Sequence, residues 1–339
     1  METLDRGRRR SRHLLVMVVM TAALMTSGVV PARATVSGEN GRIAFRRYFN
    51  DDHTRGAIFT ITSAGTGERQ VTHPPRSKLT TEPDWAPSGR WIVYTVYPDA
   101  EEDRSRIFKI RPNGTDRANL GGSCVAPCLF DGFPSWSPNG GRIAFQRGLG
   151  PAVYQNKVIA IFVMRADGTH ARQITQQGAD PTVDAPYEDQ TPTWSPTGDR
   201  LAFERFRRST DHQAIFTVRL DGTGLRRITP WRLDASQPDW SPNGRWIAFR
   251  TQESSDRHGD IALVRPSGNR LHIITSGSGK WQSCSFSPNG KMITAGHAPG
   301  HGAAGNADVY TMKVDGTDLQ NITNSNRWES APDWGPRPT

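Results

Sequence analysis

The sequence of 339 residues carries 42 Lys and Arg against 33 Asp and Glu, which gives a formal net charge of +9. Its 33 Gly, 24 Pro and only 22% charged residues indicate a folded, turn-rich chain and exclude an intrinsically disordered one. The basic residues are dispersed among acidic ones without a recognisable binding motif, so the sequence predicts no nucleic-acid partner.

The first 34 residues have the parts of an export signal. Five arginines between residues 6 and 12 precede an apolar run over residues 14–24 and the small-residue site Ala32-Arg33-Ala34. This order predicts a signal peptide over residues 1–34, a mature domain over 35–339, and a secreted or periplasmic, cell-envelope location. An uncleaved membrane anchor is the alternative, although the apolar run is short for a membrane span. The pair Arg9-Arg10 leaves both the general and the twin-arginine export routes open.

From Asn40 onward a four-part unit recurs six times. The first part is Pro-x-Trp-Ser-Pro or a close variant, and it contains an aromatic anchor. The anchors are Trp85, Trp136, Trp194, Trp240, Phe286 and Trp334. They are spaced by about 46 to 58 residues, which is near the period of a propeller blade. Their regular recurrence predicts that these rings pack between blades and do not contact a ligand.

The other three parts of the unit have the patterns of strands and tight turns. The second is an Asn-Gly or similar turn followed by an apolar strand, first seen as NGRIAF at Asn40. The third is an alternating strand that ends in a glycine turn, such as AIFTVRLDGT, and the fourth is a short strand such as RRIT. Alternation with period two predicts half-buried β-strands, and Asn-Gly favours a tight hairpin.

The two ends of the repeat region complement each other. The region begins with the second part at Asn40 and finishes with the first part at Pro332. We therefore expect an all-β, six-bladed β-propeller with four antiparallel strands per blade. The last Trp strand pairs with the first NGRIAF strand, so that strands from both termini close the ring and leave no large exposed sheet edge.

The three cysteines fall into two groups. Cys124 and Cys128 lie in the short segment SCVAPC, where an exported protein can form a local disulfide. A zinc site would need a second pair of ligands and is not predicted, while the bonding of these two cysteines stays open. Cys284 occupies a packing position of the repeat, so we expect a buried thiol.

The unit resembles the TolB-like, WD40-like (PD40) propeller repeat, whose pattern is P-x-W-S-P-D-G, I-A-F, D-G-T and L-T. The resemblance covers the chain from Asn40 to Pro336, with a departure in the fifth blade, where Phe286 replaces Trp. It implies a propeller fold. TolB itself carries an α/β domain ahead of its propeller, whereas here the repeats follow the signal directly, so we do not expect its full envelope-transport role.

Two kinds of connection alternate between the faces of such a propeller. The first-to-second and third-to-fourth turns are short and uniform, whereas the other connections are long and differ in every blade. We call the face with the long connections the loop-rich face, because variable loops on a rigid scaffold usually carry binding groups. Exposed Trp, Tyr and Arg are typical of protein-binding hot spots. The predicted partner-binding residues are Arg46, Tyr48, Arg104, Tyr187, Arg207, Trp231, Arg232, Trp281 and Trp328.

Catalytic interpretations find little support in the sequence. Prolyl-oligopeptidase-type peptidases also contain such propellers, but the chain has no G-x-S-x-G nucleophile elbow. His297, His301 and Asp308 form the best metal-like group, but Pro299 and Gly300 exclude a helix that would align the two histidines. We therefore predict a non-enzymatic protein without catalytic residues, metal or cofactor.

The leading functional interpretation is an exported binding module or scaffold that binds a protein or peptide through the loop-rich face. The alternative is a cell-envelope propeller that binds or degrades carbohydrate, because sugars also stack on Trp. Three or more carboxylate or His groups converging at the channel mouth would favour the enzyme, and a surface of Trp and Arg would favour the binding module. Membrane contact is expected only through an uncleaved signal.

Overall fold

The computed structural model describes residues 38–75, 78–98, 104–150, 158–176, 187–252, 259–276, 279–299 and 306–338. The predicted signal peptide therefore lies outside the described residues. Strands dominate the described part, which also contains the 3-10 segments η2 (Gly121–Ser123) and η4 (Trp231–Leu233), and the all-β prediction is confirmed. Among the described residues, no helix has the length and apolar character that crossing a membrane requires.

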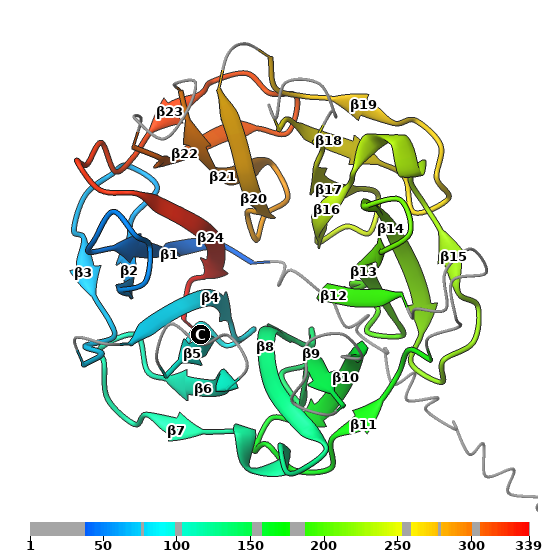
Figure 1. Ribbon diagram of the computed structural model, residues 1–339. Coiled ribbons are helices and arrows are strands. Elements are labelled where there is room, and N and C mark those ends of the chain that lie inside the picture. The colour runs from blue at the N-terminus through cyan, green and yellow to red at the C-terminus, as the bar shows by residue number, and fades with distance from the viewer. Residues whose placement is uncertain are drawn as a thin grey trace, which may run out of the picture. The chain divides into compact units, whose positions relative to one another are not determined.

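Four of the sheets contain four antiparallel strands each, in chain order across the sheet (Figure 1). The first of these contains β8 (Cys128–Trp136), β9 (Arg142–Leu149), β10 (Val158–Arg165) and β11 (Arg172–Gln173). The second contains β12 (Glu188–Trp194), β13 (Arg200–Arg207), β14 (His212–Arg219) and β15 (Arg226–Arg227). The third contains β16 (Ser236–Trp240), β17 (Ile247–Arg250), β18 (Ile261–Val264) and β19 (His272–Ile273). The fourth contains β20 (Lys280–Phe286), β21 (Met292–Ala298), β22 (Asp308–Lys313) and β23 (Gln320–Asn321).

An eight-stranded sheet combines two further sets of four strands. One set contains β24 (Glu329–Pro336), β1 (Asn40–Tyr48), β2 (Gly56–Ile61) and β3 (Arg69–Gln70). The other set contains β4 (Leu79–Trp85), β5 (Ile92–Tyr97), β6 (Arg106–Ile110) and β7 (Ala118–Asn119). A single parallel pair, Gly56 opposite Leu79, joins the two sets.

The first and last strands of the repeat region pair with each other as predicted. β1 runs antiparallel to β24, with Ile43 opposite Trp334 and Ala44 opposite Asp333. The innermost strands contact one another in the cyclic order β24, β4, β8, β12, β16, β20 and β24 again, and Figure 1 shows them around a common centre. The repeat therefore produces four-stranded, propeller-like sheets.

The outermost strands, β3, β7, β11, β15, β19 and β23, are only two residues long. The Thr that ends most copies of the fourth part explains where the ladder stops. Its hydroxyl accepts a backbone N–H from the third strand, as in the bonds from Ile215 to Thr229 (2.8 Å) and from Ile161 to Thr175 (3.0 Å). A side chain thus satisfies a buried donor that a longer fourth strand would otherwise pair.

The aromatic anchors lie between neighbouring sheets, which confirms their predicted structural role. Trp194 is 2% exposed and packs with Ala144, Ile161 and Val163 of the preceding sheet. Its indole N–H donates to the carbonyl oxygen of Ser135 at 3.0 Å. Each sheet therefore closes its core against the sheet before it, and burial of these large rings supplies much of the cohesion between repeats.

Every innermost strand carries an irregularity at the same place. The residue three positions before each aromatic anchor has a left-handed backbone, as at Glu82 (φ 53°), Phe133 (φ 50°) and Gln237 (φ 51°). The antiparallel register shifts there, for example between Thr81 and Asp84. A bulge of this kind re-aims side chains, and it places these residues on the wall of a central channel with a cavity of 200 Å³.

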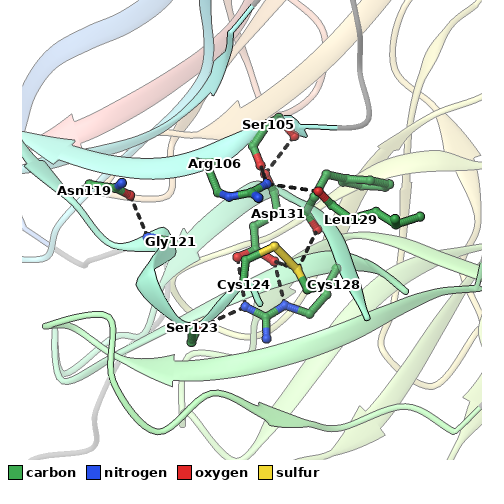
Figure 2. The surroundings of a disulfide bond; sticks show 11 residues. Ser105, Arg106, Asn119, Gly121, Ser123, Cys124, Cys128, Leu129 and Asp131 are labelled. Carbon is green, nitrogen blue, oxygen red and sulfur yellow. Dashed lines mark hydrogen bonds and ion pairs between the residues drawn. A yellow bond between two sulfur atoms is a disulfide. The ribbon is translucent and has the colours of Figure 1, made fainter. Parts of the chain in front are cut away.

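Cys124 and Cys128 form a disulfide, and Cys284 is a buried free thiol as expected. Figure 2 shows the disulfide beside Asp131 and Ser123. The Arg147 guanidinium joins both neighbours, because it donates to the Asp131 carboxylate at 2.7 and 2.9 Å and to Ser123 Oγ at 3.0 Å. The connection between β7 and β8 is thus attached to a buried ion pair.

Candidate functional site

The two kinds of long connection meet on one face. The His53 ring, which follows β1, lies 4.9 Å from the Trp328 ring, which precedes β24. In another sheet, the Gln252 N–H donates to the carbonyl oxygen of Leu233 at 3.1 Å. Such contacts join second-to-third connections to fourth-to-first connections, as the loop-rich face requires.

A cavity of 790 Å³ opens on this face over β1, β4, β5, β8, β9, β12 and β13. Its lining mixes aromatic and charged side chains. The lining includes Arg46, Tyr48, Asp52, His53, Glu82, Phe133, Glu188 and Arg208. Arg46 and Glu82 also line the channel cavity, so the two cavities share part of their walls. Ligand pockets are usually concave and combine aromatic side chains with polar groups that fix the ligand's orientation.

Arg46 is the cation of this cavity that lacks a carboxylate partner among the described residues. Its guanidinium donates to Thr81 Oγ1 at 2.7 Å and to Ser330 Oγ. The same group lies 4.3 Å from the centre of the Tyr48 ring, and its buried Nε has no hydrogen-bond partner. Hydroxyl groups and a ring hold the guanidinium in place without neutralising it, so its charge is available to an anionic group.

Three rings in contact, Tyr48, His53 and Trp328, extend outward from Arg46. The Tyr48 and His53 ring centroids are 4.4 Å apart, and His53 in turn contacts Trp328. Burial lowers the pKa of His53, and the Arg46 charge lowers it further. The imidazole is therefore neutral at neutral pH, and the rings form an apolar wall beside a single positive charge.

A second cluster of predicted residues lies apart from the cavity. The Tyr187 and Trp231 rings are stacked with centroids 6.3 Å apart, and Trp231 also contacts Phe216 at 5.6 Å. The guanidinium of Arg207 lies 5.9 Å from the Trp231 ring. The structure thus brings together Tyr187, Arg207 and Trp231 in one group, and Arg46, Tyr48 and Trp328 in another.

The expectation that Trp281 is an exposed surface residue is wrong. Its side chain is 3% exposed and stacks on His297 with centroids 4.1 Å apart, with Tyr310 against its edge. Tyr48 is also buried, at 9% exposure, and it lines the cavity. Arg104 and Arg232 are exposed and belong to neither cluster.

The carboxylate and His groups of the cavity do not form a metal site. Asp52, His53, Glu82 and Glu188 all line it, and Glu188 is ion-paired with Arg208. In the described part of the chain, the ligand atoms that lie close enough to share an ion are those of Cys124, Cys128 and Asp131, and the two sulfurs are bonded to each other.

The group of His297, His301 and Asp308 is engaged in other contacts where the structure describes it. His301 lies outside the described residues. Asp308 accepts hydrogen bonds from Asn321 Nδ2 at 2.8 Å and from the Ser325 N–H at 2.9 Å, and it lies opposite His297 in the β21–β22 ladder. These bonds hold the carboxylate as part of a turn.

Three carboxyl groups that the sequence analysis did not single out line the channel below the cavity. Each accepts a backbone N–H from the aromatic anchor of the next sheet. The Trp136 N–H donates to Asp84, the Phe286 N–H to Asp239 and the Trp85 N–H to Asp333, each at 2.7 Å. Burial and repulsion from Asp333 raise the pKa of Asp239 to about 7, and burial raises that of Asp333 to about 6.

Lowering the pH from about 8 to about 5 is expected to stabilise the protein through these carboxyl groups. A carboxyl group with a raised folded-state pKa binds its proton more tightly in the folded state than in the unfolded chain. The stability that such a group contributes is fully present below the unfolded-state pKa of the carboxyl group, at about pH 4. It is lost as the pH rises through the folded-state value, about 7 for Asp239. Urea midpoints measured across this range give the difference.

The matched variant is Asp239→Asn, which cannot ionise but keeps an oxygen for the Phe286 N–H. We expect its midpoint to change less with pH than that of the wild type. A wild-type midpoint that rises towards pH 8, or an unchanged slope in the variant, would contradict the assignment.

No curated protein matches the sequence. Among solved structures, TolB from Acinetobacter baumannii is similar with a TM-score of 0.67 and 20% identity, over 88% of this chain and 67% of that chain. A putative TolB from Agrobacterium tumefaciens has a TM-score of 0.60 and 17% identity, over 88% and 99%. An oligogalacturonate lyase from Vibrio parahaemolyticus has a TM-score of 0.54 and 12% identity, over 83% and 78%.

These likenesses, at low identity, concern the fold alone. They agree with the four-stranded repeated sheets and with the channel that the innermost strands surround. The sequence itself matches the family model described as TolB beta propeller domain, PD40, over residues 129–338. Because that match spans more than half of the chain, the protein belongs to the TolB beta propeller domain family.

Proposed function

We propose that the protein is an exported six-bladed propeller whose loop-rich face binds a protein or peptide partner. In this proposal residues 1–34 are a signal peptide and residues 35–339 form the propeller in the periplasm or outside the cell. The four separate sheets are four blades, and the eight-stranded sheet supplies two more. The cyclic contacts of the innermost strands and the pairing of β1 with β24 support closure of the ring.

The observation that carries the binding proposal is the positive charge of Arg46 at the base of an aromatic wall. A partner segment with a carboxylate, from a side chain or a chain terminus, can pair with this guanidinium. Its apolar groups can pack against Phe133 and, at the rim, Trp328. Large aromatic rings and an available arginine at the centre of a concave site are typical hot-spot components.

Carbohydrate is the alternative ligand, because the Vibrio neighbour is an oligogalacturonate lyase and uronate sugars also carry carboxylates. The same arginine and rings would suit such a sugar. Among the described residues, no three ligand atoms of Asp52, His53, Glu82 and Glu188 lie within 4.8 Å of one another, which supports binding over metal-dependent cleavage.

The test compares proteins captured from an envelope extract by the purified chain and by its Trp231→Ala, Trp328→Ala double variant. We expect at least one partner whose recovery falls by about 30-fold or more, because hot-spot truncation costs about 2 kcal/mol or more. An Arg142→Gln, Arg165→Gln variant, changed at exposed positions remote from the loop-rich face, is the control and should capture the partner normally. Equal capture by all three proteins would contradict the face assignment, and calorimetric binding of oligogalacturonate alone would favour the carbohydrate.

A further inference from the structure

The face opposite the loops is a continuous surface built from short turns, which we call the turn face. Within a sheet, the Leu220 N–H donates to the carbonyl oxygen of Asp199 at 3.2 Å and so joins the third-to-fourth turn to the first-to-second turn. Between sheets, Arg172 Nη1 donates to the Leu220 oxygen at 2.9 Å, and Lys109 Nζ donates to the Ala166 oxygen at 3.0 Å. The turns of successive sheets therefore form one surface.

Exposed basic side chains clearly outnumber exposed acidic ones on the turn face. The exposed basic residues are Arg69, Arg90, Arg117, Arg142, Arg165, Arg172, Arg219, Arg226, Arg245, Arg270, Lys291, Lys313 and Arg337. The exposed acidic residues are Glu39, Glu68, Asp116, Asp167, Asp199, Asp221, Asp315 and Asp318. Basic residues that are dispersed along the sequence are thus gathered on one side of the fold, because an Arg or Lys follows the glycine of most first-to-second turns.

Two of the acidic residues of this face are paired with basic ones. Glu39 pairs with Arg337 at 2.6 Å, and Asp318 pairs with Lys313 at 2.6 Å. In the described part of the chain, Arg142, Arg245, Arg270 and Lys291 make no ion pair. Because the exposed basic side chains outnumber the acidic ones, the surface carries a net positive charge.

Exposed aliphatic side chains accompany this charge. Leu225, Leu271, Ile273 and Leu319 are between 37% and 50% exposed and lie in or next to the outermost strands β15, β19 and β23. Leu225 directly precedes Arg226, and Leu271 directly follows Arg270. Mixed basic and aliphatic surface suits the boundary between anionic headgroups and acyl chains.

The chain also enters the domain on the turn face. The Gly38 N–H donates to the carbonyl oxygen of Pro288 at 3.2 Å, and the Asn289 N–H donates to Asn40 Oδ1 at 3.2 Å. Both partners belong to the turn that precedes Lys291.

We propose that the turn face docks on anionic lipid membranes. Its arginines and lysines bind lipid phosphates, and Leu225, Leu271, Ile273 and Leu319 enter the headgroup boundary. The loop-rich face then points away from the bilayer, towards a partner. This inference does not depend on the identity of that partner, because it rests on the opposite surface.

The test is co-sedimentation of the purified chain with phosphatidylcholine vesicles, with and without about 30% phosphatidylglycerol. We expect binding only to the anionic vesicles and a loss of binding between about 0.1 and 0.5 M salt. Neutralising Arg226, Arg270 and Lys291 to Gln should weaken binding about 100-fold, because each basic residue near the surface contributes about a factor of five. Changing Leu225 and Leu271 to Ser should weaken it about tenfold or more.

The matched control neutralises three exposed arginines of the loop-rich face, Arg104, Arg232 and Arg327, and should bind vesicles like the wild type. Circular dichroism melts confirm that each variant is folded. Three outcomes would overturn the proposal: equal binding to neutral vesicles, an equal loss in the control, or binding to a DNA duplex with the same charge dependence but not to vesicles. Because lipid is the probe, failure here leaves the proposed partner binding untouched.

Discussion

Replacing Asp189 with Ala is expected to lower the free energy of unfolding by about 3–5 kcal/mol. Asp189 is fully buried and accepts two hydrogen bonds from Arg205, at 2.6 and 2.8 Å. Removing the carboxylate leaves a buried guanidinium without its counter-charge, and that penalty is much larger than the net value of the pair. Burial raises the pKa of Asp189 although Arg205 opposes the rise, which indicates that desolvation offsets much of the attraction. Urea denaturation followed by circular dichroism measures the loss.

The control for this prediction removes both charges. An Asp189→Leu, Arg205→Met double variant fills the space with apolar groups and should recover most of the stability. The prediction is wrong if Asp189→Ala costs less than about 1 kcal/mol, which is the value of an exposed pair. It is also wrong if the double variant is no more stable than the single one.

Truncation of an aromatic anchor is the second large effect. Trp194→Ala should cost about 3–5 kcal/mol, because it removes a ring that is 2% exposed and leaves a cavity between two sheets. The bond of the indole N–H to the Ser135 oxygen is lost as well. The same ring joins β12 to the preceding sheet, so we expect the whole domain to unfold at lower urea in one transition. The measurement is the denaturation midpoint with tryptophan fluorescence and circular dichroism in parallel.

Two variants test whether the position, and not the residue type, carries that effect. Trp194→Phe keeps most of the buried area and should lose less than Trp194→Ala. Trp246→Ala removes a half-buried ring that Arg265 covers on the turn face. It should lower the free energy of unfolding by less than Trp194→Ala does. Equal losses for Trp194→Ala and Trp246→Ala would show that the anchors have no special role between sheets.

The repeat pattern predicted the strands, the structural Trp residues and the pairing of β1 with β24, because all of these depend on local periodicity and on copies that can be compared. The burial of Trp281 was not predictable in this way, because the position five residues before each aromatic anchor is mostly polar in the sequence. The structure buries all six residues at this position: Thr80, Asp131, Asp189, Ala235, Trp281 and Glu329.

Other features could not be predicted from a single copy of the unit. The buried partners of Arg147 and Arg205 lie one strand away, and only the antiparallel register brings each carboxylate opposite its arginine. The cavity around Arg46 combines strands from distant parts of the chain. The charge of the turn face could not be predicted for a similar reason, since basic residues spread along a sequence converge only when the turns lie side by side.

The two-residue outermost strands have a consequence for handling the protein. An unprotected strand edge can template the addition of a second molecule and start fibril growth. Here each outermost strand offers a neighbour only two residues of ladder, and in most copies a threonine hydroxyl caps the next amide. The protein should therefore resist polymerisation through its edges even at high concentration.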